Sequence, residues 1–176
     1  MIFLSTKRLT YIALCASLIA ALTFFCVPTP WGVPITGQTL AVLVTGLLLS
    51  PVDAFFAVLL YITMGIIGLP VFSGAKSGIG VLLGPTGGYI YSFLIGVYIL
   101  SLFAQKNKPI LGSLVFTAIV YLVGSFQLAI TTNSTFLHAL KIGMLPFLPG
   151  DFLKIYLSFV IAKRLVPLFK TQNQKA

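Results

Sequence analysis

Six long apolar runs follow one another along this chain, with only short polar stretches between them. Each run is close to the roughly 20 residues that a helix needs to cross the hydrocarbon core of a bilayer. Only 7% of the residues are charged, whereas a soluble domain has roughly 25%. We therefore predict an all-α integral membrane protein, in which a single membrane domain, residues 1–176, forms a bundle of six transmembrane helices. The predicted spans are about 9–27, 35–50, 52–70, 79–104, 109–130 and 147–168.

The second and third runs have the least certain boundaries. The second run is short, and only Ser50-Pro51-Val52 separates it from the third. Such a pair is either a tight helical hairpin or a partly re-entrant segment. The apolar pattern of the two runs fits both arrangements, because periodicity alone does not distinguish them.

The basic residues predict how the bundle is oriented, because Lys and Arg accumulate in cytoplasmic loops. If both termini are cytoplasmic, the outer loops keep only Lys76 and Lys141, with Lys154 inside the membrane. The remaining basic residues then share the cytoplasmic side: Lys7, Arg8, Lys106, Lys108, Lys163, Arg164, Lys170 and Lys175. We therefore predict an N-in, C-in topology. It also accounts for the net charge of +9 without nucleic-acid binding.

The chain is poor in the side chains that catalysis and metal binding need. It has two carboxylates, one histidine and two cysteines, too few to build a metal centre or a Cys–His pair readily. The histidine, His138, is expected in an outer loop. Lys76 follows Ala75, so it does not belong to the Gly-x-x-x-x-Gly-Lys frame of a phosphate loop. We predict a protein that is not an enzyme, with no ATPase motif, no metal and no cofactor.

Three irregular stretches fall on the predicted outer side. Residues 28–39 contain three prolines, which forbid a regular helix. Residues 68–89 are rich in glycine, which lets backbone approach a ligand or a neighbouring helix closely. Residues 146–151 combine proline, glycine and a carboxylate. We expect these outer loops to meet and to form a substrate pocket.

Asp151 and Lys154 form a charge pair at the start of the last apolar run. A charged residue inside a membrane segment is costly and by default marks a functional site. The alternative is that Asp151 only satisfies free N–H groups at a helix N-terminus, with Lys154 as its i,i+3 partner. The other carboxylate, Asp53, follows Pro51 and is predicted to be a helix N-cap on the cytoplasmic side.

Four ordered segments resemble the BioY family of biotin transport proteins, the substrate-binding S components of energy-coupling factor (ECF) transporters. They are Pro34-Ile-Thr-Gly-Gln-Thr-Leu, Gly68-Leu-Pro-Val-Phe, Gly84-Pro-Thr-Gly-Gly-Tyr and Pro146-Phe-Leu-Pro-Gly-Asp-x-x-Lys. The resemblance covers about residues 8–168. It implies a multi-pass protein of the bacterial cell membrane with a biotin pocket near the outer surface. It also implies that a separate transmembrane coupling protein and two ATPases power transport.

The resemblance suggests which residues meet biotin, the transported substrate. Asp151 would accept hydrogen bonds from the ureido N–H groups, and Lys154 or Lys76 would neutralise the biotin carboxylate. The other candidates lie in the irregular stretches and are Trp31, Thr36, Gln38, Phe72, Gly78, Thr86 and Tyr89. For the aromatic residues the alternative is an interfacial belt, and for Thr36 and Gln38 it is an ordinary loop position.

A further match is an Ala-x-x-x-Ala pair, Ala16 and Ala20, which in S components commonly forms the face on which the coupling protein docks. Small residues at this spacing also occur wherever membrane helices pack, so the alternative is packing inside the bundle. Where the family often has a basic residue between spans two and three, this chain has Val52-Asp53. The rival functions are an S component for another vitamin and a membrane scaffold without transport.

Overall fold

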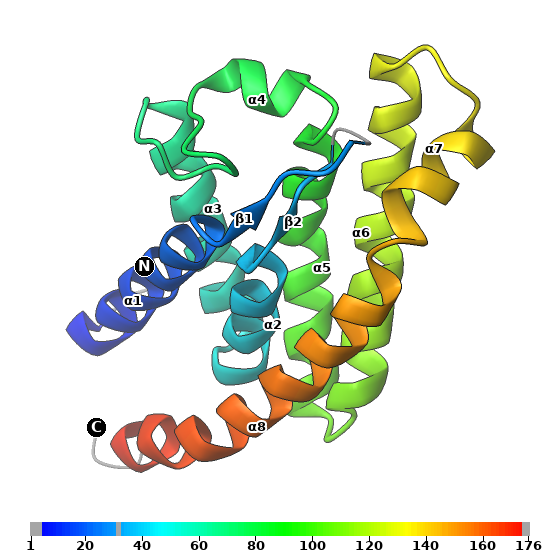
Figure 1. The fold of residues 1–176 in the computed structure, drawn as a ribbon. Helices are drawn as coiled ribbons and strands as arrows, with labels where there is room; N and C mark the ends of the chain where they lie inside the picture. Colours follow the sequence, from blue (N-terminus) through cyan, green and yellow to red (C-terminus); the bar gives the residue numbers. More distant parts are fainter. Residues whose placement is uncertain (1–4, 31–32, 174–176) are drawn as a thin grey trace.

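The computed structural model describes residues 5–30 and 33–173, which form eight helices and one pair of short antiparallel strands (Figure 1). The helices are α1 (Thr6–Thr23), α2 (Gln38–Leu48), α3 (Pro51–Ile66), α4 (Ile79–Leu83), α5 (Gly87–Gln105), α6 (Pro109–Thr131), α7 (Phe136–Met144) and α8 (Leu148–Asn173). The strands are β1 (Cys26–Val27) and β2 (Ile35–Thr36).

The helices pack as a bundle around α2 and α5. Helix α5 lies along α6 and also contacts α2, α3 and α4, while α2 packs against α1 and α8. Figure 1 shows the α3–α4 connection, α4 and α7 at the upper end of the bundle, with the C-terminus at the lower end. The irregular stretches predicted for the outer side are therefore gathered at one end of the molecule.

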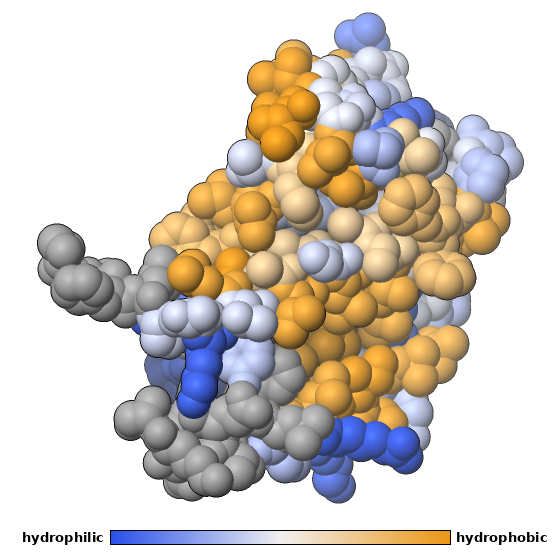
Figure 2. All heavy atoms as spheres, turned by 90° about the vertical axis from the view of Figure 1, so that its left-hand side faces the viewer, coloured by the Kyte–Doolittle hydropathy of each residue, from blue (hydrophilic) through white to orange (hydrophobic). Residues whose placement is uncertain are grey.

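Two helices, α5 and α6, are long and apolar enough to cross a membrane, and α7 with α8 makes a third candidate that is bent by 54°. Helices α2 and α3 are apolar but shorter. Large apolar side chains are exposed on many helices, among them Leu14, Phe56, Ile95, Leu122 and Phe126. Figure 2 shows apolar residues over most of one face, with hydrophilic residues gathered towards its top and bottom. This surface fits a membrane protein, whereas the six spans and their orientation stay predictions.

The second and third apolar runs form separate helices, α2 and α3, joined by Leu49 and Ser50. Ser50 is the N-cap of α3, and its Oγ accepts a hydrogen bond of 3.3 Å from the N–H of Asp53. The prediction that Asp53 is the cap was wrong, because a serine three residues earlier already occupies that position. Asp53 instead accepts hydrogen bonds from Arg8 of α1, the shortest of them 2.6 Å from Nη2.

The fourth predicted span, 79–104, is broken into α4 and α5 around Pro85. The break leaves backbone carbonyls without partners from their own helix. The Tyr91 hydroxyl and the Gly87 N–H each donate to one of them, and Gln127 of α6 adds a donor from another helix. Its Nε2 donates to the carbonyl oxygens of Leu82, at 2.8 Å, and Gly84, at 2.7 Å. Gly87 opens α5 so close to α4 that a Cβ there would overlap the Leu82 carbonyl oxygen.

The segment between α6 and α8 contains a helix that the sequence analysis did not predict. Thr135 caps α7, with its side-chain oxygen accepting from the N–H of His138 at 3.3 Å. His138 therefore lies on the first turn of an amphipathic helix, where it is exposed, and the prediction of a loop position was wrong. The helix was missed because its apolar run is short, is interrupted by His138 and Lys141, and is followed closely by Pro146.

Candidate functional site

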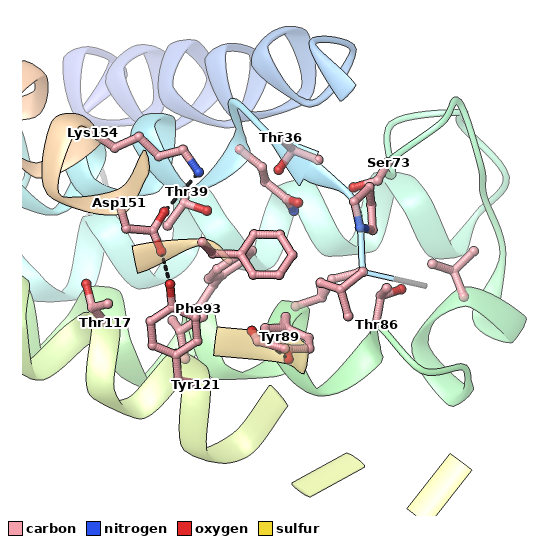
Figure 3. A pocket seen from close by; sticks show the side chains of 18 of the residues that line it. Thr36, Thr39, Ser73, Thr86, Tyr89, Phe93, Thr117, Tyr121, Asp151 and Lys154 are labelled. Atoms are coloured by element: carbon pink, nitrogen blue, oxygen red, sulfur yellow. Dashed lines mark hydrogen bonds and ion pairs between the residues drawn. The ribbon is translucent and has the colours of Figure 1, made fainter. Parts of the chain in front are cut away.

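A pocket opens between the irregular stretches and the helices below them, with an empty volume of about 860 Å³ counted together with the solvent at its mouth. Residues from β2, α2, α4, α5, α6, α7, α8 and the connections between them form its wall (Figure 3). Its lining residues are Val33, Pro34, Thr36, Gln38, Thr39, Ser73, Lys76, Val81, Thr86, Tyr89, Ile90, Phe93, Thr117, Val120, Tyr121, Gly143, Phe147, Asp151 and Lys154. This size suits a small organic ligand.

Asp151 is the centre of a polar cluster at one end of the pocket. It lies in the first turn of α8 and is only 7% exposed. Lys154 Nζ donates to its Oδ1 at 3.0 Å, and the hydroxyl of Tyr121 on α6 donates to its Oδ2. Figure 3 shows both interactions, with Ser73 and Thr86 at the far end of the pocket. The carboxylate is therefore paired, hydrogen-bonded on both oxygens and directed into the cavity.

The mouth of the pocket carries a second cation, Lys76, which is exposed. The α3–α4 connection presents it through a tight turn, closed by the backbone of Phe72 and Lys76 with N···O distances of 3.0 and 3.2 Å. Gly74 lies inside this turn with φ +73°, a conformation that glycine adopts without strain. The turn also brings Ser73 to the pocket wall.

Phe72 anchors this turn and does not line the pocket. Its ring is 1% exposed and meets Tyr61 edge-on at a centroid distance of 5.7 Å. It also covers Gly65 of α3, where any Cβ would overlap the ring. Phe72 was expected to line the pocket, and in this structure it does not, because its ring packs against Tyr61 and Gly65; its contact with a ligand stays a prediction. Sequence analysis identified the segment but not the direction of the side chain.

Gln38 lines the pocket and is also linked, through Tyr61, to the α3–α4 connection. Its Nε2 donates to the Tyr61 hydroxyl at 2.8 Å, and that hydroxyl donates to the carbonyl oxygen of Val71 at 3.1 Å. One N–H of the amide is thus engaged by α3, and the amide oxygen and the second N–H are the groups that Gln38 can offer to a ligand. Thr36 on β2 and Thr86 before α5 also line the pocket.

The remaining wall is mostly apolar and comes from α5 and α6. Tyr89 presents its ring to the cavity, and its hydroxyl donates to the carbonyl oxygen of Gly143 on α7 at 3.2 Å. Its ring lies so close to Gly124 that a Cβ there would overlap it. Phe93, Ile90 and Val120 complete this side. These apolar residues were missed because they stand inside uniformly apolar runs, where pocket-facing and lipid-facing positions look alike.

Of the predicted ligand contacts, seven line the pocket in this structure, namely Thr36, Gln38, Lys76, Thr86, Tyr89, Asp151 and Lys154. Gly78 does not line it. It precedes α4 with φ +87°, and nothing lies within 4 Å of a Cβ built there, so its role is to turn the chain. Trp31 lies outside the described residues. Which of the seven contact a ligand stays a prediction.

The two alanines proposed as a docking face differ in exposure. Ala16 has no exposed surface and belongs to the apolar core, whereas Ala20 is only partly buried. The alternative of packing inside the bundle is therefore favoured for Ala16. If a partner meets this part of α1, Ala20 and its exposed neighbour Ser17 are the positions open to it.

Comparison with known proteins places these features in a family. The family model described as "BioY family" matches residues 1–171. The chain is 37% identical to the "Biotin transporter BioY2" of Lactococcus lactis, covering 94% of this chain and 93% of that protein. It is 40% identical to the "Probable biotin transporter BioY" of Pyrococcus horikoshii, covering 76% of this chain and 80% of that protein.

A solved structure is similar over almost the same extent. It is the crystal structure of the S-component for biotin from an ECF-type ABC transporter, with a TM-score of 0.81 and 32% identity, covering 90% of each chain. The similarity in sequence and the similarity in fold thus extend over nearly the whole chain and agree with each other. The chain belongs to the BioY family.

Proposed function

We propose that this protein is a biotin-capture subunit, the S component of an ECF-type transporter. The observation that carries the proposal is a pocket with a paired carboxylate at one end and a cation at the other, in a chain that matches a biotin S-component over 90% of its length. The family membership and the names of its relatives support the same substrate.

The chemistry of biotin fits the two ends of this pocket. The ureido ring offers two N–H donors and a carbonyl acceptor, the thiophane ring and valeryl chain are apolar, and the carboxylate is anionic. Asp151 is an acceptor for the N–H groups, and Lys154 beside it can donate to the ureido carbonyl. Phe93, Val120 and the ring of Tyr89 give the apolar rings an apolar wall.

The charges favour one orientation of the ligand. The chain has only two acidic side chains, and Asp53 is paired with Arg8 while Asp151 is paired with Lys154. In the part of the chain that the structure describes, Lys76 at the mouth has no carboxylate to neutralise it. The ligand carboxylate is therefore proposed to lie at the mouth against Lys76, with the ureido ring at the Asp151 end.

We expect the purified protein to bind biotin tightly and to bind neither thiamine nor riboflavin. Isothermal titration calorimetry with the three vitamins provides the measurement. The physical reason is the combination of an anionic acceptor with an outer cation, which a cationic thiamine would not satisfy. Saturation by another vitamin with no heat from biotin would instead identify an S component for that vitamin, the main alternative function.

The energy for transport is proposed to come from other subunits. The chain would be a multi-pass protein of the cell membrane, with six spans and both termini inside, and would not hydrolyse ATP itself. A transmembrane coupling protein and two ATPases are the proposed partners. The resemblance of α1 to the docking helix of S components supports this assignment, and the basic residues at the predicted cytoplasmic ends support the orientation.

We expect Ala20→Trp to abolish co-purification with the coupling protein while biotin affinity stays near that of the unchanged subunit. A bulky ring would prevent close approach at a helix face built of small residues. Pull-down of the coupling protein and biotin titration measure the two effects separately. Ala21→Trp, at the exposed neighbouring position, is the control and should leave both unchanged.

Ala16→Trp tests the buried alanine of the same pair. Because Ala16 has no exposed surface, an indole there would overpack the core, so we expect lost thermal stability together with weakened biotin binding. If Ala20→Trp behaved in the same way, the alanine pair would be part of the bundle interior and not a docking face.

A further inference from the structure

A seam between α6 and α8 lies directly behind the charged end of the pocket. The two helices do not pack closely against each other. An apolar cleft with an empty volume of about 500 Å³, open at its mouth, separates them instead and is lined by Leu114, Ala118, Met144, Leu148, Phe152 and Ile155. Thr117, Tyr121 and Asp151 line both this cleft and the ligand pocket. The wall between the two cavities is therefore formed by these three side chains.

Tyr121 is the residue that bridges the seam. It is 5% exposed, and its hydroxyl donates to Asp151 Oδ2, a contact between residues 30 positions apart in the sequence. The other partner of the carboxylate, Lys154, comes from the same helix as Asp151 itself. Among the described residues, the Tyr121 hydroxyl is thus the only side-chain group of another helix that donates a hydrogen bond to Asp151.

We propose that Tyr121 is a positioning residue for substrate capture, which holds the Asp151 carboxylate at the angle and depth that the ligand requires. This inference rests on the proposed function, because it acts through the contact of Asp151 with the ureido ring. The Tyr121 side chain has few rotatable bonds and is buried, so its hydroxyl holds a nearly fixed position. Lys154 ends a flexible four-carbon stem and neutralises the charge without fixing its direction.

The Tyr121 hydroxyl also explains how the Asp151 carboxylate can be buried beside an apolar cleft. A buried charge requires both pairing and hydrogen bonds to its remaining lone pairs. With Lys154 on Oδ1 and Tyr121 on Oδ2, each oxygen keeps a lone pair for an N–H group of the ligand. Without the hydroxyl, Oδ2 would face the cleft unsatisfied, and the carboxylate could turn towards Lys154 and away from the ligand.

The test is Tyr121→Phe, which keeps the ring that fills the seam and removes only the hydroxyl. We expect biotin affinity to fall by about tenfold to a hundredfold, the range for losing a hydrogen bond to a charged group. Tyr91→Phe is the matched control, because its hydroxyl donates to the carbonyl oxygen of Leu82 at 2.9 Å outside the pocket. It should bind biotin as the unchanged protein does, although it also loses one hydrogen bond.

A double-mutant cycle separates positioning from direct ligand contact. On an Asp151→Ala background, Tyr121→Phe should cost no further affinity, because the group that it positions is gone. A further loss equal to that of the single variant would show that the hydroxyl acts on the ligand itself and would overturn the proposal. So would a Tyr121→Phe protein whose affinity stays within about twofold of the unchanged protein, the scale of a weak exposed contact.

Two further comparisons cover an unstable Tyr121→Phe variant and a failure of the proposed function. If Tyr121→Phe is too unstable to purify, Tyr121→Gln, which keeps a donor, should bind biotin more tightly than Tyr121→Leu, and equal affinities would contradict the proposal. If the unchanged protein does not bind biotin, the proposed function fails. If it binds biotin and Asp151→Ala weakens binding while Tyr121→Phe does not, only the positioning role fails.

Discussion

Asp151→Asn is expected to weaken biotin binding by about 30-fold to several thousand-fold, which corresponds to the roughly 2–5 kcal/mol typical of truncating one partner of a desolvated charge contact. The substitution keeps the shape of the side chain, removes its charge and turns one acceptor into a donor. That donor would face the ureido N–H groups, and Lys154 would lose its counter-ion. A titration with biotin on the folded variant measures the effect.

Asp53→Asn is the matched control, because it removes the only other carboxylate of the chain. Asp53 is also paired with a cation, with Arg8 Nη2 at 2.6 Å, but it does not line the pocket. The biotin affinity of the Asp53→Asn variant should stay unchanged. If Asp151→Asn bound biotin within about twofold of the unchanged protein and lost only a little thermal stability, the pair of Asp151 and Lys154 would be an ordinary helix-end ion pair.

Gly87→Ala is expected to destabilise the fold by about 3 kcal/mol or more, at the upper end of the cost of overpacking. The added Cβ would overlap the Leu82 carbonyl oxygen and would come within 2.6 Å of Gln127 Nε2. A backbone carbonyl cannot move aside as a side-chain end can, so α4 would have to separate from α5. We expect a clear fall in the thermal unfolding temperature, and weaker biotin binding because Val81 and Thr86 line the pocket.

Gly80→Ala provides the comparison within the same glycine-rich segment. Nothing lies within 4 Å of a Cβ built at Gly80, and the residue is exposed inside α4. Because alanine favours a helix over glycine by roughly 1 kcal/mol, this variant should be as stable as the unchanged protein or slightly more so. Equal losses for the two variants would mean that glycine is needed for flexibility and not for close approach.

Sequence analysis located the helices best where the apolar run has clear ends. The predicted span 109–130 agrees with α6, Pro109–Thr131, because Pro109 opens the helix and polar residues follow its end. The sequence analysis did not predict the break inside the span 79–104. The break is caused by Pro85 and by a packing partner, Gln127, that is 43 residues from Gly84. Local sequence carries no sign of a contact at that separation.

The same limit applies to the site. Asp151 and Lys154 were recognisable because charges are rare in this chain. Tyr121 was not, since a tyrosine in an apolar helix gives no sign of the carboxylate that it meets on another helix. Phe72 shows the opposite error. Its segment was recognised, but the direction of its ring depends on the gap left by Gly65, which only the packed structure reveals.

The two hydrogen bonds of Gln127 have a consequence for the order in which the membrane domain is assembled. The carbonyls of Leu82 and Gly84 emerge from the ribosome more than forty residues before the Gln127 side chain that donates to both of them. Before α6 arrives, the Tyr91 hydroxyl and the Gly87 N–H can already donate to these two carbonyls, so the break between α4 and α5 forms locally, and Gln127 adds a second donor to each carbonyl once α6 has joined. The link between this end of the pocket and α6 is thus made late in biogenesis, by a helix inserted after the segment that it joins.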